Sequence, residues 1–387
     1  MPSPVDAKTL ADIWKAHERF TMGQKGGRRS ILRHMNLTQV DISNRNLTEA
    51  DFTGSDFYRA TMFGVILDRA ALYCASLGEV DARYSHLRRA DLRGACFRGA
   101  NFSFAELDGA DLRAGTVAIS DKDGNFNILR QRASQGPHQV SFAGGSLEET
   151  NLENADAPEV DFTNCNMKGV NFGGANLKGA NFCGAVLHGA SFLNAKLVGA
   201  SFERAVLTGV KLTDMQINPS QLKDCFLEPG PETIAKIPEI LARIDSAVLW
   251  VETKGRRGSK GIFDGEDLRL VARNFRGKAL SAISAKNTIA VAVDFSNCEL
   301  QGAHFEEADL RDAIFDNADL RGACFKGANL AHTKFKNCNL QSLPLNSGKS
   351  LKTAFDGALL AQTSFRNVLY EDGVREAVSV LGATFDI

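Results

Sequence analysis

The chain has 387 residues, 44% hydrophobic and 24% charged, and its 45 Lys and Arg side chains are balanced by 46 Asp and Glu side chains. This composition excludes a disordered tail and argues against a dedicated nucleic-acid-binding protein. No stretch reaches the eighteen apolar residues of a membrane span, and the N-terminus lacks the apolar core of a signal peptide, so we expect a cytoplasmic protein. The count of 25 Phe against 2 Trp and 4 Tyr indicates a repetitive use of Phe.

Residues 1–35 are predicted to form a helix followed by a glycine-rich basic loop. Leu10, Ile13, Trp14 and His17 fall on one face of that helix. The loop contains three cationic residues that could hold an anion, Lys25, Arg28 and Arg29. The alternative is a solvated linker, because the loop lacks the spacing of a phosphate-binding motif.

Residues 36–222 contain apolar residues at every fifth position. The first run extends from Leu37 to Val117, and 13 of its 17 central residues are Leu or Phe. A second run continues in the same frame from Phe142 to Ile217. A period of five fits neither an amphipathic helix nor a flat strand, so the chain must turn a corner once per unit.

Each unit reads A-[D/N]-[L/F]-x-G or close to it, as in Ala90, Asp91 and Leu92. This motif resembles the pentapeptide-repeat family and covers about two thirds of the chain. The resemblance implies an all-β solenoid, a right-handed quadrilateral β-helix with four pentapeptides per coil, here in two stacks with short capping α-helices. It also implies that the small residue and the central Leu or Phe point inward. Since Phe and Leu alternate from Phe172 to Leu207, Phe should stack on two opposite faces.

Residues 118–139 interrupt the repeat and are predicted to form an inserted, projecting β-hairpin around Asp123-Gly124. Loops that protrude from the coils contact the target in some family members, so the hairpin provides our candidate partner-binding residues: Asp121, Asp123, Asn125, Phe126, Arg130 and Arg132. A passive insertion is the alternative. The spacing imitates a calcium loop, but Phe126 replaces its glycine and Arg132 its acidic ligand, so no metal site is predicted.

The second half repeats the design of the first. Residues 223–274 are predicted to form a second capping helix and basic loop, and residues 275–387 a second stack with a C-terminal closing segment. Gly27 pairs with Gly258 and Leu37 with Leu268, an offset of 231 residues. Each helix is expected to cap the coils that follow, since an open solenoid end exposes apolar interior. The second loop adds three candidate anion-binding residues, Arg256, Arg257 and Lys260.

No catalytic constellation, cofactor motif or metal-ligand pair is found, so the protein is predicted to be a non-enzyme without cofactors. We expect a scaffold for an unidentified protein partner; the closing segment leaves a homodimer open, and direct nucleic-acid binding is not expected. The alternative is a DNA-mimicking modulator of DNA gyrase or topoisomerase IV, as in quinolone-resistance members of the family. A mimic of duplex DNA needs tens of acidic groups. Residues 36–117 have 11 acidic and 9 basic side chains, too neutral for that role.

Overall fold

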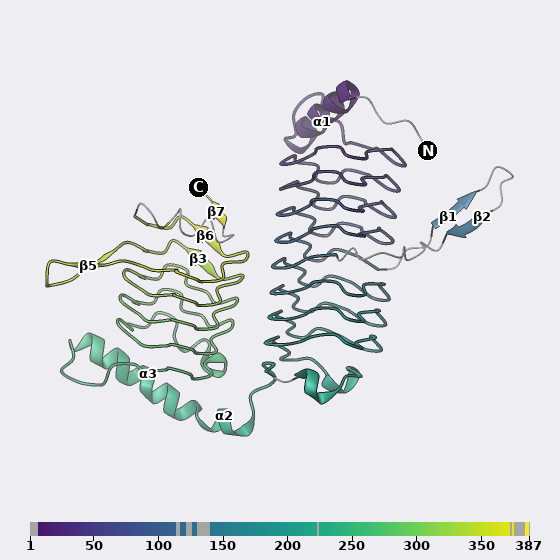
Figure 1. The fold of residues 1–387 in the computed structure, drawn as a ribbon. Helices are drawn as coiled ribbons and strands as arrows, with labels where there is room; N and C mark the ends of the chain where they lie inside the picture. The colour runs from purple at the N-terminus through teal and green to yellow at the C-terminus, as the bar shows by residue number, and fades with distance from the viewer. Residues whose placement is uncertain are drawn as a thin grey trace. The chain divides into compact units, whose positions relative to one another are not determined.

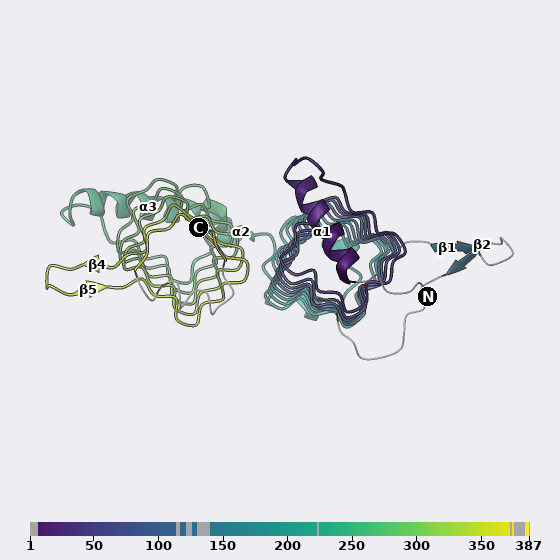
Figure 2. The same ribbon diagram turned by 90° about the horizontal axis from the view of Figure 1, so that it is seen from above.

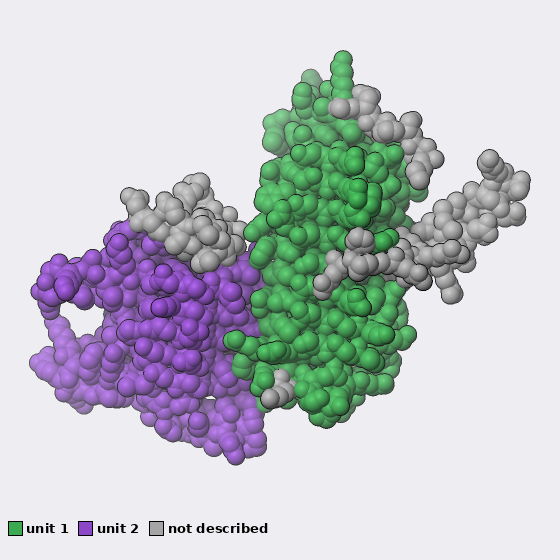
Figure 3. Space-filling view, viewed as in Figure 1, with its two compact units in different colours: residues 1–228 green, residues 229–387 purple. Residues whose placement is uncertain are grey.

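The computed structural model describes residues 7–113, 117–120, 126–129, 140–222, 224–371, 374 and 384–386. The chain divides into two compact units, Met1–Glu228 (unit 1) and Pro229–Ile387 (unit 2), shown in Figure 3. Each unit is a stack of coils around its own hydrophobic cluster (Figure 1). The fold of each unit is therefore a solenoid.

A ladder of parallel single-residue bridges connects the coils of each unit. In unit 1 Ile31 pairs with Asp51 and Asn36 with Asp56, and in unit 2 Ala279 pairs with Glu299. Because most partners are twenty residues apart and the repeat is five, four repeats complete one coil. The coils of each unit superimpose when seen from above (Figure 2). Longer strands do not form within the repeats, because each repeat places a two-residue turn directly after its bridging region.

Stacked Phe rings fill the interior of the coils. Phe162, Phe182 and Phe202 form one column, with ring centroids 5.2 and 4.9 Å apart and interplanar angles of 16° and 6°. Phe172 lies on a different face and meets Phe182 edge-on at 5.6 Å and 83°. The Phe columns on two faces therefore pack edge-on against each other in the core, which confirms the alternation predicted from the sequence.

The small-residue slot lies at a buried corner. At many of the positions where it holds a thiol or hydroxyl, that group donates to a carbonyl oxygen one coil earlier, whereas Ser85 and Thr288 donate to a carbonyl three residues earlier. Cys298 Sγ donates to Phe275 O at 2.9 Å, and Thr333 Oγ1 donates to Leu310 O at 2.8 Å. The slot thus pairs the donors of these small polar residues, whereas Ser30, which holds the same slot in the first coil, has no earlier coil to donate to.

The Asp or Asn before each central residue shapes the turn that follows. Asn171 Oδ1 accepts a hydrogen bond from Gly173 N at 2.9 Å, an Asx turn, and Gly174 follows with φ of +67°. At Gly184 an added Cβ would lie 2.2 Å from Asn164 Oδ1. Glycine at this place in the repeat therefore serves both the left-handed backbone and close coil stacking.

Helices cover the first coil of each unit. Helix α1 (Ala7–Thr21) buries Leu10 and Trp14 against the core of unit 1, and the Trp14 ring lies 6.2 Å from Phe52. Helix α3 (Ile237–Glu252) buries three residues against the core of unit 2, namely Ile240, Ile244 and Ala247. The short helices are α2 (Pro231–Ala235) and the 3-10 helices η1 (Leu212–Asp214), η2 (Pro219–Leu222) and η3 (Arg269–Val271). Among the described residues, no helix has the length and apolar character needed to cross a membrane.

Two insertions lengthen the spacing between coils. Strands β1 (Val117–Ser120) and β2 (Phe126–Leu129) pair antiparallel, and the bridge from Asn101 reaches Ser141, forty residues on. In unit 2 a smaller hairpin of β4 (Leu343–Pro344) and β5 (Ser350–Leu351) stretches the spacing to thirty, from Cys324 to Ala354. The sequence analysis missed this second hairpin, which adds ten residues to one coil where the first insertion adds twenty.

The ladder of unit 2 extends beyond the predicted start of its stack. Its first bridge joins Ile262 to Ser284, inside the segment assigned to the second cap and loop. The parallel strands β3 (Lys334–Lys336), β6 (Ser364–Arg366) and β7 (Thr384–Asp386) place Phe385 in register with Phe365. Apart from Glu371 and Val374, the predicted closing helix at 371–381 lies outside the described residues.

Candidate functional site

The predicted hairpin residues are placed only in part. Asp121, Asp123, Asn125, Arg130 and Arg132 lie outside the described residues, and Phe126 begins strand β2. The candidate partner-binding role of this hairpin stays a prediction.

The first basic loop folds tightly back onto helix α1. Arg28 N donates to Ala16 O at 2.9 Å, and a Cβ at Gly27 would lie 2.4 Å from Phe20 N, so only glycine fits there. Lys25 is exposed at the tip of the loop. This fold carries the chain from the helix to the first bridging residue, Ile31, and brings Arg28 and Arg29 beside the helix.

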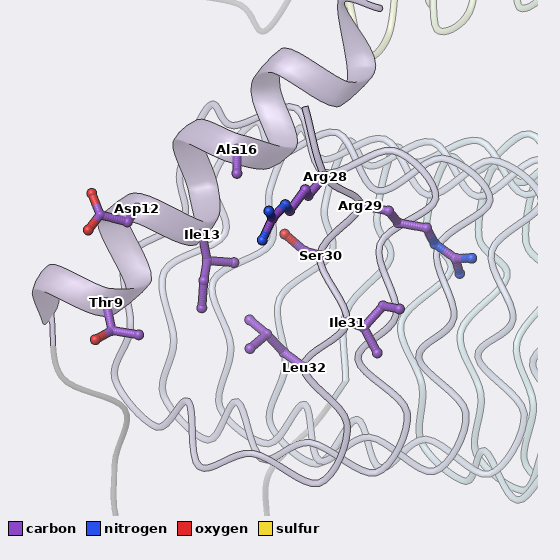
Figure 4. A pocket seen from close by; sticks show the side chains of 9 residues that line it. All are labelled: Thr9, Asp12, Ile13, Ala16, Arg28, Arg29, Ser30, Ile31 and Leu32. Atoms are coloured by element: carbon purple, nitrogen blue, oxygen red, sulfur yellow. The ribbon is translucent and has the colours of Figure 1, made fainter. Parts of the chain in front are cut away.

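A groove lies between helix α1 and the first coil of unit 1 (Figure 4). Its volume is about 440 Å³, within the range of small-molecule sites. One wall belongs to the helix and the other to the end of the loop and the first coil. The lining residues are Thr9, Asp12, Ile13, Ala16, Arg28, Arg29, Ser30, Ile31 and Leu32.

The two predicted arginines in this groove behave differently. Figure 4 shows the Arg28 guanidinium lying between the helix and Ser30, whereas Arg29 extends the other way. Arg29 Nε donates to Glu49 O at 2.6 Å. Asp12 turns its carboxylate away from Arg28 in the same view. Arg28 is thus the cation that faces the groove.

Ser30 and His17 form the buried base of this site. Ser30 is 3% exposed, and its Oγ has no hydrogen-bond partner within the described structure. His17 Nδ1 accepts from Ser30 N at 2.8 Å, so its Nε2–H donates to Thr48 O at 3.1 Å. Burial lowers the pKa of His17 below its ordinary value of 6.5. The imidazole is therefore a neutral strut between the helix, the loop and the last repeat of the first coil.

The second basic loop is built differently. Arg256 Nε donates to Thr253 O at 3.1 Å, and Arg257 N donates to Thr253 Oγ1 at 2.9 Å. Lys260 is exposed just before the first coil of unit 2. The six predicted anion-binding residues thus belong to two separate loops, and only Arg28 and Arg29 line the described groove.

A second surface feature lies on the early coils of unit 1. Phe63, Tyr84 and Phe104 face outward in one column, with centroids 5.4 and 5.0 Å apart; we call them the aromatic column. The Arg83 guanidinium lies 5.7 Å from the Phe63 ring, and Arg93 lies 5.4 Å from Tyr73 on another face. Most other Phe residues of the chain are buried core rungs.

Sequence reasoning missed Ser30, His17 as a hydrogen-bonding strut, and the aromatic column. Phe63 and Phe104 lie one and two places after a central residue, so the repeat register alone places them outside. For Ser30 the available signal was weaker: the matching position of the second module holds Gly261, so the two modules differ there by one side chain.

The comparisons with known proteins concern the repeat. A family model described as pentapeptide repeats matches residues 30–71, 75–113, 138–174, 165–204 and 175–214, and one described as a pentapeptide repeat region matches residues 288–372. No curated protein sequence matches the chain.

Solved structures with pentapeptide repeats resemble the chain at low identity. HetL, a protein of Nostoc sp. strain PCC 7120 involved in heterocyst differentiation regulation, is 18% identical over 90% of this chain and 100% of its own, with a TM-score of 0.25. A thylakoid-lumen protein of Arabidopsis thaliana is 24% identical over 33% of this chain and 69% of its own, with a TM-score of 0.21. Full-length QnrB1, a plasmid-mediated fluoroquinolone resistance protein, is 14% identical over 53% and 99%, with a TM-score of 0.25.

Proposed function

The chain belongs to the pentapeptide-repeat family, and from that premise we propose that it is a non-enzymatic scaffold that binds a protein partner through the outward faces of its coils. The right-handed, four-sided β-helix implied by the family resemblance provides a stiff support for such a surface. The hairpin between residues 118 and 139 is a further candidate contact. All eight cysteines are free thiols, which supports a reducing compartment such as the cytoplasm.

The aromatic column is the observation that carries this proposal. A solenoid needs its large rings inside, where they stabilise the core, yet within the column Phe63 is 37% exposed and Tyr84 and Phe104 are half-buried. Tyr58, outside the column, is 38% exposed. Tyr58 also lies beneath Arg59, whose Cζ is 5.1 Å from the ring. Aromatic and Arg side chains are enriched at protein interfaces and supply most of their binding energy. Their concentration on the early coils of unit 1 favours that surface as the contact.

The surface charges disfavour the DNA-mimic alternative. Several carboxylates of unit 1 are neutralised by an Arg two residues later, as in Asp91 with Arg93 and Asp111 with Arg113, each at 2.7 Å. Duplex DNA carries one unpaired negative charge per about 1.7 Å of its axis. A surface of bidentate ion pairs does not reproduce that field.

Affinity capture tests the proposal. The immobilised full chain is incubated with a lysate of its native host, and captured proteins are identified by mass spectrometry. We expect a partner that the Y84S/F104S double variant loses and that a matched control, L193S, retains; Leu193 is 52% exposed on a later coil of the same unit. Circular dichroism checks that each variant folds. Equal capture by all three proteins would refute the role of the column, and inhibition of gyrase supercoiling by sub-micromolar protein would favour the alternative.

A further inference from the structure

Equivalent contacts match the residues of the two caps, and this match reveals an open site in unit 1. Ile31 and Ile262 are the first bridging residues of their ladders. Arg28 N donates to Ala16 O in unit 1, and Ser259 N donates to Ser246 O in unit 2 at 3.3 Å. Ile13 and Arg243, each three residues before that acceptor in its helix, therefore hold the same place in the two caps.

In unit 2 the chain's own guanidinium fills the groove between helix and coil. Arg243 Nη1 donates to Ile262 O at 2.9 Å, and its Nη2 donates to Glu239 Oε1 at 2.7 Å. Its Cζ lies 5.8 Å from the Phe263 ring. The position that matches Ser30 is Gly261, where an added Cβ would lie 3.0 Å from Ala247 Cβ. Unit 2 thus has no room for a Ser30 side chain and no need of a ligand.

Unit 1 differs at both matched positions, with Ile13 in place of Arg243 and Ser30 in place of Gly261. Ile13 is too short and apolar to fill the groove, which keeps its volume of about 440 Å³. Ser30 adds a buried hydroxyl without a partner, and Figure 4 shows its oxygen turned toward the side where the Arg28 guanidinium lies. Leaving a buried hydroxyl unpaired destabilises the folded chain, because the group loses its hydrogen bonds to water without replacing them. Such a group is expected where a ligand completes its hydrogen bonding.

We propose that this groove binds a small organic carboxylate with an apolar body. The carboxylate accepts hydrogen bonds from the Arg28 guanidinium and the Ser30 hydroxyl, the pairing that a planar guanidinium favours. The apolar body lies against Ile13 and Leu32. Arg28 brings one positive charge to the groove, which matches a monoanion better than a dianionic phosphate. This site is independent of the aromatic column and of the proposed scaffold function.

Ligand-observed NMR titrations of the full chain test the site with hexanoate as the probe. We expect hexanoate to bind saturably. Acetate has the same head group and 1-hexanol a similar apolar body, and each should need at least tenfold higher concentration to reach the same occupancy. Absence of saturable hexanoate binding at 20 mM would overturn the proposal.

Three variants locate the probe. Arg28→Gln and Ser30→Ala are each expected to weaken hexanoate binding, by about tenfold or more for Arg28→Gln. Ile13→Arg transfers the guanidinium of unit 2 and is expected to abolish binding. Arg256→Gln, a matched control in the second basic loop, should leave binding unchanged. Because Arg28 is exposed, its replacement leaves the fold intact; equal binding by wild type and Arg28→Gln would therefore overturn the proposal even if Ile13→Arg failed to fold.

Discussion

Units 1 and 2 close the same kind of solenoid end in two ways. In unit 2 a helix arginine, Arg243, reaches the first coil and satisfies its carbonyl oxygen at Ile262. In unit 1 a buried histidine, His17, connects the helix to the loop and the first coil, and an open groove remains beside it. A duplicated cap can therefore keep its covering role in both copies while one copy gains space for a ligand.

The largest expected effect tests whether the two units are independent. Phe182 in unit 1 and Phe315 in unit 2 are both fully buried and belong to separate hydrophobic clusters. Phe182→Ala and Phe315→Ala should each lower the free energy of unfolding of their own unit by about 3–5 kcal/mol. Urea unfolding with limited proteolysis and mass spectrometry assigns each transition to a unit.

Leu193→Ala, at an exposed site, is the control and should change stability by less than about 0.5 kcal/mol. A single transition shifted equally by both Phe variants would show that the units unfold as one.

The arginine of the second cap should matter to stability more than its counterpart in the first. Arg243→Leu removes hydrogen bonds to Ile262 O and Glu266, whose side chain is 17% exposed, and we expect a loss of about 1–2 kcal/mol from unit 2. Ile13→Leu in unit 1 should cost less than about 1.5 kcal/mol. Thermal unfolding measures both, and an unchanged melting temperature for Arg243→Leu would contradict the role assigned to it.

The histidine strut makes the first cap sensitive to acid. Because burial lowers the folded-state pKa of His17, the unfolded chain binds its proton at a higher pH. Stability is therefore full above pH 6.5 and declines as the pH falls toward the folded pKa. Denaturant unfolding at a series of pH values measures the slope.

His17→Gln keeps an amide acceptor and donor but removes the titration, so its profile should be flatter in this range. His86 works in the opposite direction, because its hydrogen bond to Glu106 raises its pKa; it stabilises the folded state below pH 6.5 and loses that effect as the pH rises through its folded pKa. An unchanged slope in His17→Gln would show that His17 does not carry the acid sensitivity.

The smallest effect concerns the corner thiols. Burial raises the pKa of Cys298 to about 11 and that of Cys338 to about 12, so thiolate is scarce at pH 8. Both should resist iodoacetamide in the folded chain and react once the chain is denatured, as peptide mapping can show. Rapid labelling of Cys338 in the folded protein would contradict its place in the core.

The repeat could be predicted from the sequence because each position has one local role. The resemblance of the motif to the pentapeptide-repeat family implied that the central Phe182 and the small-residue position that Cys298 occupies both point inward, and both are buried. The hairpin of β4 and β5 adds half as many residues as the insertion at 118–139 and escaped the sequence analysis. The groove could not be predicted for another reason, because it depends on which helix residue faces the first coil. The coils of the two units match at an offset of 231 residues, whereas their helices match at an offset one residue smaller. Ile13 is therefore aligned with Ile244 by the sequence offset but takes the place of Arg243 in the structure.

A crystal structure of the full chain with hexanoate tests the account most directly. It should show two capped solenoid units, with the carboxylate between Arg28 and Ser30 in unit 1 and the Arg243 guanidinium on the carbonyl oxygen of Ile262 in unit 2. A groove closed by Arg28 itself, or hexanoate bound elsewhere with Ser30 paired to another protein group, would contradict the distinction between the two caps.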